Sequence, residues 1–314
     1  MNAFTRFAHD AKKFLKPKNL KAKLRGRGKV FPILSYTLIC LWVLVFAYLV
    51  IWAIIASLKA DYDFFYNTAG WPKLGFHFDN YTKAFQAVAV RVIRNGKVIR
   101  VGYFELIFNS LLMCAGVPFF ALLDVAACSY ITSKYRHFKF TRAIFAIVIF
   151  INYVPLSASL ASNIRLQKAL GLFDTIWGQW IVASGGFGAY FLIYYATFKS
   201  LSWTYAEAAF VDGASHFRVF FQIMLPMTKS TFFALFITHF IGAWTDYQTA
   251  LIYLPTHPTL GLAAWSFQFD TGTETTKIPV KLAGMLGMTL PLLVLFTCFH
   301  KKLMGSMTVG GLKG

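Results

Sequence analysis

Long runs of apolar residues constrain this chain more than any other feature of its sequence. An α-helix rises about 1.5 Å per residue, so roughly 20 apolar residues cross the ~30 Å hydrocarbon core of a bilayer. Hydrophobic residues make up 57% of the chain and charged residues only 14%, whereas about 25% of the residues in soluble domains are charged. We therefore expect an all-α membrane protein with six transmembrane helices, at Phe31–Leu58, Tyr103–Ile131, Ala143–Ala161, Ile176–Phe198, Ser230–Leu254 and Leu282–Phe299.

The positive charge of the chain is large and unevenly placed. The net charge is +19, but Lys and Arg do not form a face with interleaved aromatic residues, which argues against nucleic acid as a partner. Ten of them precede the first apolar run, and ten more fall in the second and fourth connections and the C-terminal segment. Cytoplasmic loops are enriched in Lys and Arg, so we expect both termini in the cytoplasm. The predicted organisation is a basic tail at 1–30, a membrane domain at 31–300 and a Gly-rich tail at 301–314.

The first predicted external loop contains VRVIRNGKVIRV, two alternating runs of Val, Ile and Arg around Asn95 and Gly96. Asn-Gly favours the tight type I′ turn of a two-residue hairpin. We expect a small external β-hairpin, which is either a structural cap on the loop or a docking edge for an external partner. The third external connection, Pro255–Val280, holds Trp265, Phe267 and Phe269 close together. These aromatic residues either anchor the chain at the lipid headgroups or contact a partner.

The connection before the fifth span reads EAAFVDGASHFRVFFQIMLP, which is too polar and too short to cross the membrane. Thr204 followed by Glu207 fits a capping box, so a helix should begin at about Tyr205. Gly213 then suits the positive φ that follows a helix end, and Ser215 suits the cap of a second helix. We expect a helix-turn-helix at the cytoplasmic surface.

The second helix of this segment should be amphipathic. Its large apolar residues recur at spacings of three and four, which places them on one helical face. Pro226 then interrupts further helix. The residues of the predicted face are Phe217, Phe220, Phe221 and Met224.

The same segment resembles the EAA loop of ABC-importer permeases, which has Glu-Ala-Ala, three residues, Gly, nine residues, and then Ile, any residue, Leu and Pro. Asp212 before Gly213 also resembles the "DGA" core of carbohydrate-type permeases. The ending GSMTVGGLKG resembles the tail of maltose-type permease subunits. The resemblance covers about Phe31 to the C-terminus, and its EAA positions, with the added Asp212, are Glu207, Ala208, Ala209, Asp212, Gly213, Ile223, Leu225 and Pro226.

This resemblance implies a function and a set of partners. In the family the EAA loop (residues 204–228 here) is a coupling loop that docks in a cleft on a separate ATPase and transmits its movements. The implied assembly contains a second, homologous permease, two ATPase subunits that bind ATP and Mg, and an extracytoplasmic solute-binding protein. The implied location is a bacterial cytoplasmic membrane, and the implied cargo is a sugar or oligosaccharide.

The sequence offers little support for an enzyme. It has no Walker-type phosphate loop, no H-E-x-x-H and no paired His/Cys spacing, so we expect no cofactor and no metal site in this chain. A secondary carrier would usually show internal repeats, which are not visible. The alternatives are an ABC permease for another solute, such as an amino acid, a polyamine or glycerol phosphate, or a membrane enzyme or secondary carrier.

Ionisable residues inside predicted spans are candidate pathway residues because charge in a membrane tends to face a cavity or a polar partner. Asp246 shares a helical face with His239, Gly242 and Ala243, and this face either lines a pathway or packs against another helix. For Asp124, a hydrogen bond to a neighbouring helix is favoured over substrate contact. Aromatic and polar neighbours of Asp246 suit sugar recognition, namely Trp244, Tyr247 and Gln248. Trp244–Tyr247 resembles the family's W-N-acidic stretch, with Thr245 in place of Asn.

Overall fold

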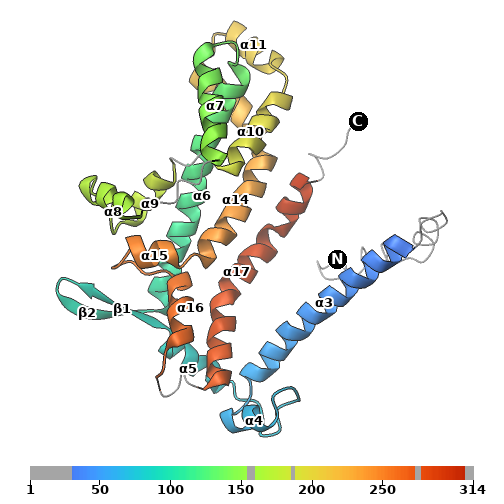
Figure 1. The fold of residues 1–314 in the computed structure, drawn as a ribbon, viewed down its shortest axis with the longest axis vertical. Coiled ribbons are helices and arrows are strands. Elements are labelled where there is room, and N and C mark those ends of the chain that lie inside the picture. Colours follow the sequence, from blue (N-terminus) through green and yellow to red (C-terminus); the bar gives the residue numbers. More distant parts are fainter. Residues whose placement is uncertain (1–29, 154–159, 185–187, 273–276, 308–314) are drawn as a thin grey trace.

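A computed structural model describes residues 30–153, 160–184, 188–272 and 277–307 of the chain. Helices α6, α14 and α17 run along the long axis of the molecule, and α3 is splayed away from them (Figure 1). In the first half of the chain the elements are α3 (Val30–Ser57), α4 (Asp61–Tyr66), α5 (Asp79–Ala87), β1 (Ala89–Arg94), β2 (Lys97–Gly102), α6 (Tyr103–Lys134) and α7 (Lys139–Tyr153).

The second half of the chain is helical throughout its described elements. It contains α8 (Leu160–Ala169), α9 (Ile176–Ala183), α10 (Ala189–Ser200), α11 (Thr204–Val211), α12 (His216–Val219), a π-helical turn (Phe220–Met224), α13 (Leu225–Met227), α14 (Lys229–Thr245), α15 (Gln248–Tyr253), α16 (Leu260–Phe269) and α17 (Ile278–Met307). The predicted helical fold class with a small hairpin is confirmed. Helix α17 continues past the predicted tail boundary at residue 300.

Three described helices are long and apolar enough to cross a membrane, and they match the first, second and sixth predicted spans. They are Pro32–Ser57, Tyr103–Lys134 and Ile278–Thr297. A fourth span results if His216–Met227 and Lys229–Thr245, which meet at 74°, are counted together. The predicted span at Ala143–Ala161 coincides with α7 in its first part, and residues 154–159 lie outside the described residues.

Two predicted spans are not single helices. The segment predicted as Ile176–Phe198 forms α9 and α10, because Ser184 and three glycines separate them in sequence and glycine disfavours helix. The segment predicted as Ser230–Leu254 breaks after Thr245, where Asp246 takes an extended backbone conformation. Asp246 is therefore not inside a helix, contrary to the prediction.

The predicted hairpin is confirmed. Strands β1 and β2 pair antiparallel in a register that places Arg94 opposite Lys97 and leaves two residues in the turn. Both turn residues have positive φ, 51° for Asn95 and 72° for Gly96, as a type I′ turn requires.

Side chains that bond to backbone carbonyl and N–H groups brace the end of the molecule that carries the hairpin, which we call the hairpin end. The Asn109 amide of α6 donates to the Pro258 carbonyl at 2.9 Å, and the Ser110 hydroxyl accepts from the Leu260 N–H at 2.7 Å. The buried Asn80 amide of α5 donates to carbonyls of Ser57 and Lys59. Buried polar backbone groups are thereby satisfied, and these bonds join α5 to the end of α3 and α6 to the start of α16.

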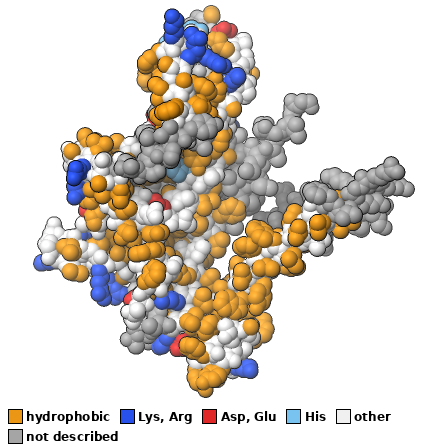
Figure 2. All heavy atoms as spheres, viewed as in Figure 1, with side chains coloured by type: hydrophobic (Ala, Val, Ile, Leu, Met, Phe, Trp, Pro, Cys, Tyr) orange, Lys and Arg blue, Asp and Glu red, His pale blue; other side chains and the backbone are white. Residues whose placement is uncertain are grey.

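The opposite end carries α7 and α11, and we call it the elbow end. A core cluster there joins α6, α10 and the α11–α14 region, and a second cluster at the hairpin end joins the strands to α6, α14, α16 and α17. Figure 2 shows apolar side chains over much of the surface between the two ends and a group of Lys and Arg side chains at the elbow end.

Candidate functional site

The elbow, residues 204–228, is a pair of short helical segments joined by a tight turn. Helix α11 ends with two bonds, from the Gly213 N–H to the Phe210 carbonyl at 3.0 Å and from the Ala214 N–H to the Ala209 carbonyl at 2.9 Å. With φ of +78° at Gly213, these bonds form a Schellman motif, which satisfies the last carbonyls of the helix. The predicted left-handed turn at Gly213 is confirmed.

The second half of the elbow begins at a capping serine and changes from α-helix to a wider π-helical turn before Pro226. The Ser215 hydroxyl accepts from the Arg218 N–H at 3.4 Å, as predicted. Residues Phe220–Met224 form a π-helical turn. Pro226 has no N–H to donate to the preceding turn, and such a defect is accommodated by local π geometry. The chain then bends by 74° into α14.

The elbow is packed firmly against the ends of the long helices. Phe220 and Met224 are buried, and the Tyr130 ring of α6 lies with its centroid 5.1 Å from Phe220 and 5.5 Å from Phe198 of α10. The Tyr135 hydroxyl and the His216 Nδ1 are 2.8 Å apart. Movement of the elbow must therefore move α6 and α10 with it, because close-packed cores transmit displacement.

Two local predictions for the elbow were wrong. Thr204 and Glu207 form no capping box, because the helix begins one residue earlier than expected and the Ser202 hydroxyl accepts from the Thr204 N–H instead. The four apolar residues predicted on one face are divided, since Phe220 and Met224 are buried while Phe217 and Phe221 are exposed. The π-helical turn shifts the register within this stretch.

The free surface of the elbow combines polar groups with two prominent apolar side chains. Val211 is 87% exposed and Phe217 is 78% exposed. Of the predicted coupling residues, Ala209 is buried in the chain's own core and is not presented to a partner. Ile223 and Leu225 are half-buried, and the exposed coupling residues are Glu207, Ala208, Asp212, Gly213 and Pro226.

A cavity of about 450 Å³ lies between α6, α8, α9, α14 and α15. This volume falls within the roughly 300–1,000 Å³ of small-molecule pockets. Four of the predicted pathway-face residues line it together, namely His239, Gly242, Ala243 and Asp246. Polar groups from other helices join them, among them Gln167, Gln179 and Thr249.

The polar groups of this cavity differ in how far they are already bonded. The amide of Gln179 donates to the amide oxygen of Gln167 at 3.0 Å, and both side chains are buried. The Asp246 carboxylate accepts from the backbone N–H groups of Gln248 and Thr249 and so caps the start of α15. Nδ1 of His239 is a buried ring nitrogen without a bonding partner among the described residues.

The other predicted pathway residues lie elsewhere. Trp244 and Tyr247 border a separate cavity of about 300 Å³ between α14, α16 and α17, where Tyr247 stacks on Trp265 at 5.1 Å. Asp124 is half-buried on α6, on the face that carries Val117 but nearer the elbow, and makes no hydrogen bond to another described residue. The predicted helix-to-helix bond of Asp124 is thus absent from the described part of the chain.

Comparison with known proteins decides the family. Residues 125–303 match the family of binding-protein-dependent transport system inner membrane components. This chain belongs to that family. The matched residues run from the second half of α6 through the elbow and α14 to the C-terminal part of α17. The protein is therefore an integral inner-membrane permease of the ABC-importer class.

Relatives of this permease are similar over most of their length. It is 25% identical to the diacetylchitobiose uptake system permease protein NgcG of Streptomyces coelicolor over 89% of this chain and 88% of that protein. It is 29% identical to the arabinooligosaccharides transport system permease protein AraQ of Bacillus subtilis over 76% and 79% of the two chains. A bacterial ABC transporter involved in alginate import has the same fold, with a TM-score of 0.70 and 17% identity over 87% of this chain and 96% of that one.

The permease carries site features that sequence reasoning missed. Val211 follows the apolar Phe210 in sequence and gave no signal of exposure, and Phe217 was assigned to the same helical face as Phe220 and Met224, which are buried. Gln167 and Gln179 approach His239 from α8 and α9, which are distant in sequence. A residue pattern within one helix cannot show that side chains from separate helices meet.

Proposed function

We propose that this permease moves a sugar or oligosaccharide into the cell and that a separate ATPase drives it through the elbow. The observation that carries the proposal is the elbow itself, which is bent at Gly213, anchored in the core shared with α6 and α10, and apolar at its exposed tip. An element of this kind can convert closure of a partner into reorientation of membrane helices. The separate ATPase subunits would bind ATP and Mg, and we assign no cofactor to this chain.

The proposed orientation places the elbow end in the cytoplasm. Figure 2 shows a group of Lys and Arg side chains at that end, with others around the hairpin, and the cytoplasmic loops of membrane proteins are ordinarily rich in these residues. The hairpin end would then face the extracytoplasmic solute-binding protein. A second, homologous permease would complete the pathway and cover α3, whose most apolar stretch is 0% buried within this chain.

Carbohydrate is the proposed cargo class for two reasons. The relatives named above are described as uptake systems for diacetylchitobiose and for arabinooligosaccharides. The 450 Å³ cavity also offers amide, imidazole and hydroxyl groups, which suit the hydroxyls of a sugar better than a charged or purely apolar solute. A polyamine would call for several carboxylates and an amino acid for a basic group as well, whereas the described residues that line this cavity include one carboxylate, Asp246, and neither Lys nor Arg.

The test is reconstitution of the permease pair, the ATPase and a solute-binding protein in proteoliposomes with radiolabelled disaccharides, amino acids and polyamines. We expect ATP-dependent accumulation of a saccharide only when the binding protein is present on the hairpin side. Accumulation of an amino acid or polyamine instead would refute the carbohydrate assignment, and accumulation without any ATPase would refute the importer mechanism.

The cavity assignment makes a separate prediction for His239→Leu. Loss of a bonding group in a desolvated site costs roughly 1–3 kcal/mol, so sugar delivered per ATP should fall about tenfold while ATP hydrolysis without binding protein is unchanged. Thr238→Val is the matched control, because the Thr238 hydroxyl is on the exposed side of α14 and bonds to the Ala234 carbonyl. Equal transport ratios in both variants would show that His239 does not contact the cargo.

A further inference from the structure

The two faces of the hairpin are chemically different. Side chains alternate between the faces of a strand, and the register pairs Arg91 with Arg100 on one face and Val90 with Val101 on the other. The face that carries Val90, Val92 and Val101 packs on the body, where Val92 and Val101 are buried. The opposite face, which we call the outer face, consists of Arg91, Ile93, Val98 and Arg100.

The outer face exposes an apolar pair to solvent. Ile93 is 67% exposed and Val98 is 71% exposed, and the register places them directly opposite each other. In a small sheet with one buried face, the solvent face is ordinarily polar. An exposed pair of apolar, β-branched residues at this position is typical of an interface rather than of a free surface.

The outer face also holds two like charges together. Arg91 and Arg100 are cross-strand partners, and like charges directly opposite each other destabilise a sheet. Arg100 donates to the carbonyls of Gln86 and Ala87, while Arg91 makes no hydrogen bond or ion pair to a described residue. The pair therefore lacks an acidic partner within the described chain.

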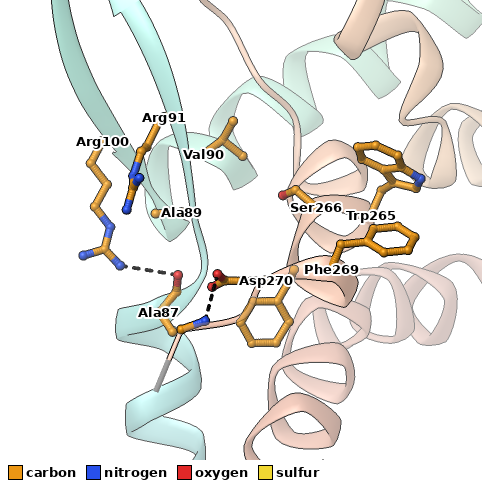
Figure 3. Close-up of a pocket in the computed structure, with 11 residues that line it drawn as sticks. Ala87, Ala89, Val90, Arg91, Arg100, Trp265, Ser266, Phe269 and Asp270 are labelled. Atoms are coloured by element: carbon orange, nitrogen blue, oxygen red, sulfur yellow. Dashed lines mark hydrogen bonds between the residues drawn. The ribbon is translucent and has the colours of Figure 1, made fainter. Parts of the chain in front are cut away.

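Beside this arginine pair lies an open groove of about 910 Å³. Figure 3 shows Arg91 and Arg100 side by side on the strands, across the groove from Trp265 and Phe269 of α16. Arg and large aromatic residues are enriched where proteins bind one another. The groove therefore joins a cationic wall to an aromatic one, and Asp270 lies between them as the one acidic residue among the described residues that line it.

The hairpin is fixed rather than free to swing. The Arg94 guanidinium donates to the Glu105 carboxylate and, through Nε at 3.0 Å, to the Thr256 carbonyl. Thr256 in turn donates from its N–H at 2.9 Å and its hydroxyl at 2.7 Å to the Asp174 carboxylate. These bonds join the hairpin to α6 and to the loops before α9 and α16, so the outer face is preorganised for binding.

We propose that the outer face and the adjoining groove receive an acidic protrusion of the solute-binding protein, with carboxylates on Arg91 and Arg100 and an apolar side chain against Trp265 and Phe269. This inference rests on the proposed importer function. A protruding protein segment suits a concave groove, whereas a flat lipid surface would reach only its rim. Charge complementarity of this kind accelerates association and sets orientation.

The test uses the assembled transporter in nanodiscs of phosphatidylcholine and the solute-binding protein that stimulates ATP hydrolysis by the wild-type complex. For the double variant Arg91→Glu and Arg100→Glu we expect binding of that protein to weaken about 30-fold, and the salt dependence of binding to be largely lost. Lys97→Glu is the matched control for a charge reversal on the same hairpin, because Lys97 lies on the opposite face, and its affinity should stay within about threefold of wild type.

A second variant guards against misfolding of the hairpin. Ile93→Ser with Val98→Ser leaves every charge in place and should also weaken binding, while ATP hydrolysis without the binding protein stays at the wild-type level. Unchanged affinity in both double variants, with stimulation retained, would refute the docking surface and leave the importer function standing. Loss of binding to phosphatidylglycerol vesicles with unchanged binding-protein affinity would assign the outer face to lipid. Failure of any solute-binding protein to stimulate the wild-type complex would instead contradict the importer function itself.

Discussion

Replacing both Val211 and Phe217 with aspartate is expected to detach the ATPase from the permease. These residues are the most prominent apolar groups on the exposed surface of the elbow. Burial of a Val or Phe side chain is worth roughly 1.5–3 kcal/mol, and a carboxylate in the same pocket adds a desolvation cost. The double variant should therefore bind the ATPase at least a hundredfold more weakly, as measured by co-purification and by titration of detergent-solubilised permease with ATPase.

The control for this variant is Phe65→Asp. Phe65 is 67% exposed on α4 at the hairpin end, so the substitution makes the same chemical change far from the elbow. We expect that variant to retain the ATPase. If the elbow variant also retains it, with membrane yield and thermal unfolding like those of the wild type, the apolar tip of the elbow is not the ATPase contact.

Replacing Gly213 with valine is expected to uncouple transport from ATP hydrolysis. Gly213 has φ of +78°, and a Cβ added there would meet nothing within 4 Å. The cost of substitution is therefore conformational rather than steric crowding, roughly 1–3 kcal/mol for a β-branched residue held in this region. The elbow relieves this strain by changing its bend, so uptake should fall about tenfold or more while the complex still hydrolyses ATP.

Asparagine provides the graded control at the same position. Among non-glycine residues Asn tolerates left-handed backbone best, so Gly213→Asn should keep most of the uptake and Gly213→Ala should lie between Asn and Val. The measurement is sugar transported per ATP in proteoliposomes. If the valine and asparagine variants transport equal amounts of sugar per ATP, the bend at Gly213 does not couple ATP hydrolysis to transport.

Local rules predicted the features of this permease that depend on a few neighbouring residues. Asn95-Gly96 dictated the hairpin turn, Gly213 the left-handed turn and Ser215 the cap, because each requirement is met by one residue's backbone freedom or side chain. The predicted capping box between Thr204 and Glu207 does not form, because the hydroxyl of Ser202, two residues before Thr204, accepts from the Thr204 N–H.

Features set by several elements were beyond sequence reasoning. The apolar spacing in the second elbow helix assumed a regular helix, and the π-helical turn before Pro226 left Phe217 outside the core. Hydropathy found the three spans that the structure forms as long apolar helices, but it showed neither the division of the fourth predicted span nor the break at Asp246, where a carboxylate caps a new helix. The cavity forms because α8 and α9 lie beside His239 of α14, and the periodicity of one helix gives no information about which other helices lie next to it.

Coupling of this permease to ATP hydrolysis requires the elbow end to contact an ATPase. A photo-crosslinking amino acid placed at position 217, on the elbow, or at position 98, on the hairpin, tests it in membranes from cells that express the whole transporter. We expect position 217 to crosslink to a chain containing a Walker phosphate loop and position 98 not to do so. Crosslinking of that ATPase from position 98, or its absence from every exposed elbow position, would show that the elbow end is not the ATPase contact.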